Sequence, residues 1–186
     1  MTAKTGYCAS CTCGQVTLEA IGAPILSAVC YCESCRAAAR QFEQEPGAPS
    51  VLRGDGGVEY CLFRKDRATI SRGGESLRER RLIAASPTRR VIATCCNSPM
   101  FLDFTSGHWL NLYRDRLSDD APPLEMGVMV KDQHRRRAPG RDSELSSAPG
   151  EIHDQASGGV GGDRFSAVQG GLVIGAPKSP DGRLVL

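Results

Sequence analysis

Three closely spaced cysteines constrain this chain more than any other feature of its sequence. Cys30, Cys32 and Cys35 follow the order Cys-x-Cys-x-x-Cys. This spacing lets three sulfur atoms converge on one centre and leaves one position of a tetrahedral metal ion open, as in catalytic zinc sites. A competing interpretation is a closed structural zinc site, with Cys8 or Cys61 as the fourth ligand. Whether the fourth position is open therefore decides the function.

Two further pairs of cysteines lie far apart in the sequence. Cys11 and Cys13 precede the central motif, and Cys95 and Cys96 follow it at a distance. A structural zinc ion commonly takes its four ligands from two close pairs that the fold brings together. The two pairs could therefore close one structural zinc site, and the loss of that site would cost folding free energy.

The composition limits the classes of protein to consider. The chain has 186 residues, nine cysteines and a formal net charge of +2. Its length suggests one domain with some extra length, and the balanced charge argues against a nucleic-acid partner. No apolar signal segment or run long enough to span a membrane occurs, so a cytoplasmic protein without membrane contact is expected. In a reducing compartment, clustered cysteines are more often metal ligands than disulfides.

The hydrophobic pattern predicts a mainly β domain with one short helix. Alternating or continuous apolar runs are short and separated by turn residues, which favours strands. An alanine-rich stretch over residues 34–42, ended by Pro46, is the one expected helix. Strands are expected over residues 15–19, 24–30, 58–63, 68–71, 82–85, 90–94, 100–104, 108–112 and 124–130.

The last third of the chain differs in composition from the rest. Residues 131–186 hold ten of the 21 glycines but only one of the ten aromatic residues, Phe165. Such a segment buries too little apolar surface to offset the entropy of ordering it. We expect a folded domain over residues 1–130 and a glycine-rich, largely disordered tail over 131–186. The run from His134 to Arg137 is interpreted as a solvated linker, and residues 172–174 could add one strand.

The three cysteine motifs together resemble the glutathione-dependent formaldehyde-activating enzyme (GFA) family, also called the CENP-V/GFA domain family. The resemblance rests on Cys11-x-Cys13-Gly14-x-Val16, on Cys30-x-Cys32-x-x-Cys35-Arg36, and on Cys96-x-Ser98-Pro99 before an apolar strand. It implies an Mss4-like, zinc-stapled β-sheet fold with two zinc ions. One would be structural, held by the first and last motifs, and the other catalytic, held by Cys30, Cys32 and Cys35.

The chain departs from the family pattern at three positions and resembles an uncharacterised branch. The family usually has Cys-x-x-Cys-Gly in the last motif, whereas this chain has Ala93 three residues before Cys96 and the second thiol at Cys95. The fourth structural ligand is therefore Cys95, Cys8 or a water molecule. Asn97 replaces a glycine, which is a mild change because Asn tolerates left-handed backbone. Tyr31 stands where many relatives have histidine.

The resemblance implies a carbon–sulfur lyase-type activity. A small thiol such as glutathione would bind at the open zinc position and add to a small aldehyde such as formaldehyde, or the adduct would be cleaved. Arg36 and Arg40, one helical turn apart, could meet a substrate carboxylate or form a solvated helix face. The alternative is a non-catalytic, zinc-binding interaction module. A redox role for Cys95 and Cys96 ranks last, and the oligomeric state is open.

Overall fold

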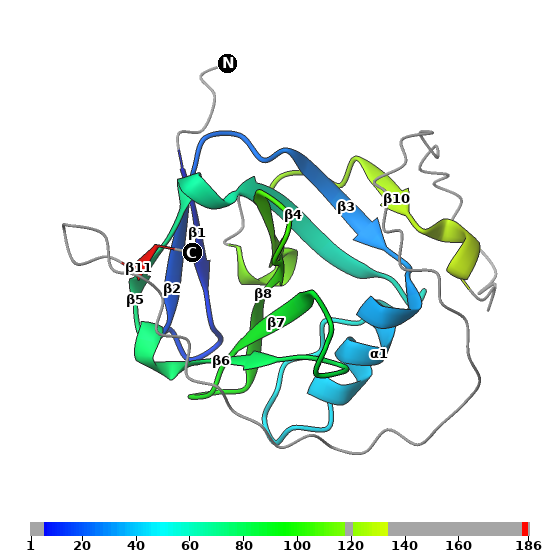
Figure 1. Cartoon of the computed structure of the whole chain (residues 1–186), viewed down its shortest axis with the longest axis horizontal. Coiled ribbons are helices and arrows are strands. Elements are labelled where there is room, and N and C mark those ends of the chain that lie inside the picture. The colour runs from blue at the N-terminus through cyan, green and yellow to red at the C-terminus, as the bar shows by residue number, and fades with distance from the viewer. Residues whose placement is uncertain (1–5, 118–120, 134–183, 186) are drawn as a thin grey trace.

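Two β-sheets and one α-helix make up the part of the chain that the structure describes (Figure 1). The structure is a computed structural model of the whole chain, and it describes residues 6–117, 121–133 and 184–185. Strands dominate these residues, so the predicted mainly β class is confirmed.

The strands are antiparallel except for one parallel pair at a sheet edge, β10 with β3. The four-stranded sheet has the order β1 (Gly6–Ser10), β2 (Thr17–Ile21), β5 (Ala68–Arg72) and β11 (Leu184–Val185). The seven-stranded sheet has the order β10 (Met126–Val128), β3 (Leu26–Cys30), β4 (Val58–Arg64), β9 (Trp109–Tyr113), β8 (Ser98–Phe104), β7 (Thr88–Ala93) and β6 (Leu77–Arg80).

The strand β4 shows how the layers are built, because both of its faces are buried. Side chains alternate between the two faces of a strand. Cys61 and Phe63 pack into the core shared with the four-stranded sheet, whereas Tyr60 and Leu62 pack into a second core with α1. The seven-stranded sheet therefore forms the middle layer, with the smaller sheet on one face and the helix on the other.

The helix α1 (Glu33–Phe42) begins one residue before the predicted position. Its buried side chains are mostly small, which lets the helix approach the sheet closely: Cys35, Ala38, Ala39 and Phe42. Glu33 lies in the first turn and Arg40 in the last, and both charges match the helix dipole. The helix thus starts directly at the cysteine motif. Four short 3₁₀ helices complete the described part: η1 (Lys65–Arg67), η2 (Gly74–Ser76), η3 (Arg114–Arg116) and η4 (Val130–Asp132).

The strand predictions fail mainly at sheet edges. The predicted strand over 82–85 is wrong: these residues form bends and turns, Ile83 is largely exposed, and the strand is instead β6. Edge strands tolerate charged residues because one side lacks a partner strand, and β6 contains only one apolar residue, Leu77. The edge strand β1 was not predicted, and β2 begins two residues later than expected.

The segment after residue 121 packs against the cysteine motif rather than leaving the domain. The backbone N–H of Tyr31 donates to the carbonyl of Val128 at 3.0 Å, and Arg36 Nη1 donates to the carbonyl of Asp132 at 2.7 Å. The predicted boundary at residue 130 falls inside η4. Most of the predicted tail, with the run 134–137 and the segment 172–174, lies outside the described residues, whereas β11 pairs with β5.

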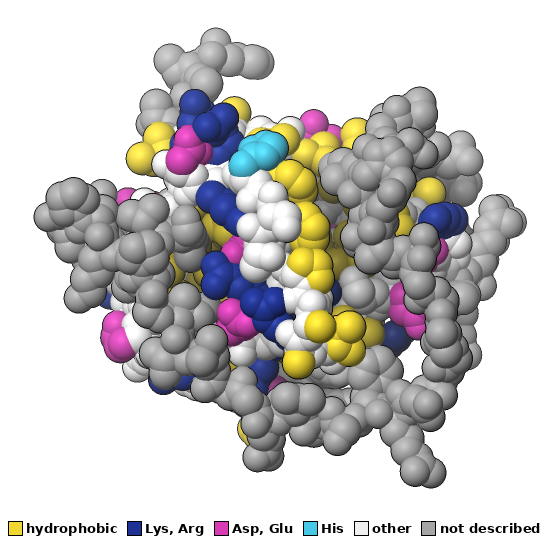
Figure 2. Space-filling view, in the orientation of Figure 1, with side chains coloured by type: hydrophobic (Ala, Val, Ile, Leu, Met, Phe, Trp, Pro, Cys, Tyr) yellow, Lys and Arg dark blue, Asp and Glu magenta, His cyan; other side chains and the backbone are white. Residues whose placement is uncertain are grey.

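Basic and acidic side chains lie side by side on the face shown in Figure 2. Ion pairs among the described residues include Arg81 with Glu79 and Arg89 with both Glu79 and Asp103. Within the described part of the chain, no helix has the length and apolar character needed to cross a membrane.

Candidate metal centres

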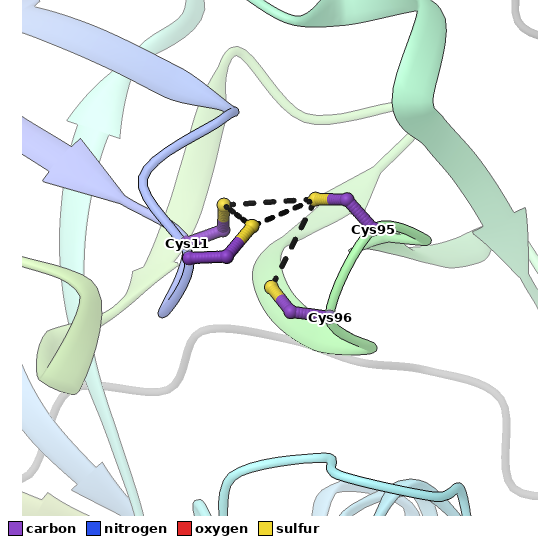
Figure 3. Close-up of side chains that lie close together, drawn as sticks. Cys11, Cys95 and Cys96 are labelled. Carbon is purple, nitrogen blue, oxygen red and sulfur yellow. Dashed lines mark hydrogen bonds between the residues drawn. The ribbon is translucent and has the colours of Figure 1, made fainter.

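The first candidate centre brings together four cysteines from two distant segments (Figure 3). Cys11 and Cys13 lie in the loop between β1 and β2, and Cys95 and Cys96 lie in the turn between β7 and β8. All four sulfur atoms lie within 4.8 Å of one another. We call this set the four-cysteine centre.

The sulfur positions of the four-cysteine centre fit a tetrahedral zinc ion. The Sγ–Sγ distances are 3.5 Å for Cys11–Cys13, 3.8 Å for Cys11–Cys95, 3.3 Å for Cys13–Cys95 and 3.9 Å for Cys95–Cys96. Zn–S bonds of about 2.3 Å in a tetrahedron separate the sulfurs by about 3.8 Å. A disulfide would need about 2.05 Å. The donor set therefore suits one zinc ion better than a disulfide.

Sharp turns in both loops place these sulfurs. Gly14 has a φ of 75° and donates its N–H to the carbonyl of Cys11 at 2.9 Å. Asn97 has a φ of 52°, directly after the two adjacent cysteines, and its side-chain amide donates to the carbonyl of Pro46 at 3.0 Å. Asn is one of the few non-glycine residues that adopt this backbone readily. This explains why Asn97 can occupy a position where the family has glycine.

A buried serine, Ser98, joins the two loops and was not selected from the sequence as a site residue. Its hydroxyl oxygen accepts from the Thr12 N–H at 3.1 Å and lies 2.8 Å from the Thr12 hydroxyl. It also lies 3.0 Å from Cys96 Sγ. Burial works to raise the pKa of Cys96, but hydrogen bonds from Ser98, Thr12 and the Cys13 backbone lower the pKa to about 5. These contacts favour the thiolate form, which is the form that binds metal.

Two cysteines proposed as alternative ligands lie outside both centres. Cys8 is exposed, and its sulfur lies 3.8 Å from the Ser10 hydroxyl. Cys61 is fully buried, with its sulfur 3.5 Å from the Ser27 hydroxyl. Neither joins a cluster of potential ligands in the described residues. The geometry thus favours Cys95 over Cys8 as the fourth member of the four-cysteine centre.

The second candidate centre comes from one continuous stretch of chain. Cys30 ends β3, Cys32 is the N-cap of α1, and Cys35 lies in the first helical turn. Their three sulfurs lie within 4.8 Å of one another, and the described residues supply no fourth Cys, His, Asp or Glu atom to this group. We call this set the three-cysteine centre.

The start of α1 stabilises negative charge on the three-cysteine centre. Cys32 Sγ accepts the N–H of Cys35 at 3.4 Å, and the positive end of a helix dipole favours thiolates. Hydrogen bonds from Cys30 and Cys35, and then from Ser34, hold the pKa of Cys32 far below its usual range. The hydrogen bond to Cys32 raises the pKa of Cys30 correspondingly. Cys32 is thus the first of the three to lose its proton.

Three polar side chains that the sequence did not single out border this centre from the interior. Arg90 on β7 is only 2% exposed, and its Nη2 donates to the Ser34 carbonyl at 3.1 Å. Tyr60 on β4 and Tyr113 on β9 are buried, with ring centroids 5.0 Å apart. The available sequence signal was weak, since an arginine and two tyrosines in strands that also carry other polar residues do not stand out.

Tyr31 is fixed in place by its surroundings. Its hydroxyl donates to Asp55 Oδ2 at 3.1 Å. A Cβ atom added at Gly57 would lie 2.9 Å from the Tyr31 ring, and one added at Gly127 would lie 3.3 Å from it. The ring therefore packs closely against backbone on two segments. Where many relatives place a histidine, this chain has a side chain that anchors neighbouring loops.

The two helix arginines have different surroundings. Arg36 donates to the Asp132 carbonyl and packs near Gly56, whereas Arg40 is exposed. Of the two interpretations of these arginines, the pairing of both side chains on one substrate carboxylate is not prepared by the structure, because Arg36 already holds η4 against α1.

Comparison with known proteins supports the resemblance seen in the motifs. The model of the family described as glutathione-dependent formaldehyde-activating enzyme matches residues 6–45. No curated protein matches the chain. Among solved structures, a crystal structure of a Rhodobacter sphaeroides protein is 15% identical, covers 62% of this chain and 91% of its own, and has a TM-score of 0.43. The resemblance of this chain to the GFA family, seen in its cysteine motifs, is thus supported by the match over residues 6–45.

Proposed function

We propose that the chain is a zinc-dependent enzyme of the carbon–sulfur lyase type, which forms or cleaves the adduct of a small thiol and a small aldehyde. One observation carries the proposal. Three sulfurs converge in the three-cysteine centre, and within residues 6–117, 121–133 and 184–185 no fourth Cys, His, Asp or Glu joins them. Catalytic zinc sites characteristically keep one ligand position open in this way.

In this proposal, the chain's own residues divide the work between two zinc ions. Cys11, Cys13, Cys95 and Cys96 hold a structural ion, and Cys30, Cys32 and Cys35 hold a catalytic one. When bound there, zinc supplies a Lewis acid that favours the thiolate form of a small thiol near neutral pH. The Cys35 N–H, which donates to Cys32 Sγ at 3.4 Å, orients one sulfur ligand, and the packed Tyr31 ring keeps the motif in place.

The proposed reaction conserves atoms and electrons. The thiol loses its proton, its sulfur lone pair forms a bond to the aldehyde carbon, and the carbonyl oxygen takes up a proton. The product is an S-hydroxymethyl thioether. In the reverse direction, the carbon–sulfur bond breaks and its electron pair returns to sulfur. Glutathione and formaldehyde are the proposed pair because they appear in the description of the matched family.

The second candidate function is a zinc-binding interaction module without catalysis. One observation favours it: Arg36 is already bound to the Asp132 carbonyl, so one expected contact for a glutathione carboxylate is taken. A surface hollow also lies at the four-cysteine centre, and it is lined by Cys13, Gly14, Gln15, Arg72, Gly73, Glu75 and Ser76.

Two further parts of the proposal concern the chain as a whole. We place the protein in the cytoplasm, since free clustered thiols persist in reducing compartments. We also keep the division into a zinc domain over 1–130 and a tail over 131–186, with the amendment that η4 packs against α1 through Arg36.

Exchange NMR on a mixture of glutathione and formaldehyde tests the activity. We expect the zinc-loaded protein at micromolar concentration to accelerate exchange between free glutathione and its hydroxymethyl adduct. Cys32→Ser removes one sulfur of the centre and should abolish the acceleration, whereas Cys8→Ser, outside both centres, should not. Equal exchange rates with and without the loaded wild-type protein would contradict the lyase proposal for this pair of substrates.

A further inference from the structure

Arg90 is a buried cation without a carboxylate partner. It is 2% exposed, and no Asp or Glu in the described part of the chain forms an ion pair with it. Its Nη2 donates to the Ser34 carbonyl, while its Nε has no hydrogen-bond partner there. Burying an uncompensated charge is costly. The position of Arg90 therefore requires an anion close by.

The three-cysteine centre is the anion that the structure offers. Arg90 Nη2 donates to the Ser34 carbonyl at 3.1 Å and lies 3.5 Å from the Ser34 hydroxyl, and Ser34 lies in the segment between Cys32 and Cys35. Cys35 is buried in a core cluster against which Cys30 and Cys32 pack. The guanidinium of Arg90 is thus bound to the cysteine motif in the core beneath α1.

Two tyrosine hydroxyls extend this donor set. The hydroxyls of Tyr60 and Tyr113 are buried and have no hydrogen-bond partner among the described residues. Both rings share a core cluster with Cys35, and their centroids lie 5.0 Å apart. Buried polar groups are normally satisfied. These two free donors beside the cysteine motif are therefore available to a negatively charged group there.

We propose that Arg90, assisted by the hydroxyls of Tyr60 and Tyr113, compensates the charge of the metal-loaded three-cysteine centre and thereby selects an anionic thiolate as its fourth ligand. This inference rests on the proposed function. Three thiolates and one divalent zinc ion carry one net negative charge, which the guanidinium cancels. With an incoming thiolate bound, the site then carries one net negative charge, instead of the two that it would carry without Arg90.

The four-cysteine centre supplies an internal comparison. Arg116 is also buried, and its Nε has no hydrogen-bond partner among the described residues. It directly precedes Leu117, which shares a core cluster with Cys11, and Cys96 packs against that cluster. Four thiolates and zinc carry two negative charges, so one arginine leaves that centre negative. Only the three-cysteine centre is neutral with its arginine, and only there does an added anion meet no net repulsion. Arg90 acts through Cys35 and is a positioning residue.

The test uses the full chain loaded with ¹¹³Cd, which reports on each thiolate centre by its own NMR resonance. 2-Mercaptoethanol serves as the thiol probe and is titrated while the resonance of the three-cysteine centre is followed. Arg90→Met should shift that resonance and weaken thiol binding by about tenfold or more, because a close charge is lost. The resonance of the four-cysteine centre should not move.

Two variants serve as matched controls. Arg116→Met should shift only the resonance of the four-cysteine centre and leave thiol binding unchanged. Arg90→Lys keeps the charge and should recover most of the thiol affinity, which a purely packing role of Arg90 would not explain. Thiol affinity within twofold of wild type in folded Arg90→Met overturns the proposal.

A further variant keeps the test decisive if Arg90→Met does not fold. Tyr60→Phe removes one hydroxyl and should weaken thiol binding about threefold while shifting the same resonance; no change in either quantity then overturns the proposal. The outcomes separate the two hypotheses. If the protein catalyses glutathione–formaldehyde exchange but Arg90→Met binds the thiol normally, only the charge compensation by Arg90 is rejected. If thiol binding depends on Arg90 but the protein does not catalyse the exchange, only the lyase activity is rejected.

Discussion

The two cysteine centres use the same ligand type but are built in opposite ways. The four-cysteine centre joins the β1–β2 loop to the β7–β8 turn, so its members lie far apart in the sequence. The three-cysteine centre is complete within one strand end and one helix start. A metal ion in the four-cysteine centre would tie two sheets together, whereas a metal ion in the three-cysteine centre would close only a very short loop of the chain. The difference suggests that only the local centre is free to serve chemistry.

The largest expected effect is the loss of the fold when the four-cysteine centre loses a ligand. Zinc contributes about 10 to 16 kcal/mol in small zinc domains, which is as much as the total stability of most domains, about 5 to 15 kcal/mol. Cys96→Ser should therefore abolish cooperative thermal unfolding, followed by circular dichroism.

The matched control for this prediction is Cys8→Ser, because Cys8 is an exposed thiol outside both centres. It should unfold like the wild type. If Cys96→Ser unfolds in a cooperative transition close to that of the wild type, the four-cysteine centre is not what holds the fold together.

A smaller effect is expected at the three-cysteine centre. Cys32→Ser removes a sulfur ligand, yet serine is a favoured N-cap residue and can still accept the Cys35 N–H. Native mass spectrometry should show the metal content fall from two ions per chain to one, while the fold persists. Lost metal binding would lower the unfolding free energy by about 4 kcal/mol or less. Global unfolding of the Cys32→Ser variant would instead show that both centres are needed for the fold.

The smallest effect is expected from the hydrogen bonds that join the loops of the four-cysteine centre. Ser98→Ala removes a fully buried hydroxyl that accepts the N–H of Thr12, a residue that is itself exposed. The loss of such a hydrogen bond costs about 0.5 to 1.5 kcal/mol, and we expect two bound ions with a lower melting temperature. Ser10→Ala, at a half-exposed position outside the centre, is the control in calorimetry. Equal melting temperatures for both variants would show that Ser98 contributes nothing to joining the loops.

The sequence was informative wherever a single segment carries the signal. The run 58–63 predicts a strand because Tyr60 to Phe63 are apolar in succession, and the alanine-rich stretch predicts α1. The cysteines stand out because metal ligation demands one residue type at short spacing. By contrast, the edge strands β1 and β6 carry mostly polar or half-buried residues, so no hydrophobic period marks them.

The supporting residues of both centres could not be predicted, because their roles arise only in the folded chain. Arg90 contacts Ser34 across 56 positions of sequence, and Ser98 contacts Thr12 across 86. Neither spacing follows a helical or strand period. Strand pairing across the seven-stranded sheet decides which polar side chain meets which cysteine, and that pairing depends on the whole fold.

The contrast in sequence separation also sets an order of events during folding. Local contacts form before distant ones, because loop closure costs more entropy as the chain between the partners grows. The sulfurs of Cys30, Cys32 and Cys35 can meet once α1 has started, whereas Cys95 and Cys96 must wait for β7 and β8 to pair. We therefore expect an early, half-loaded species. It would hold its metal weakly until β7 brings Arg90 beneath the helix.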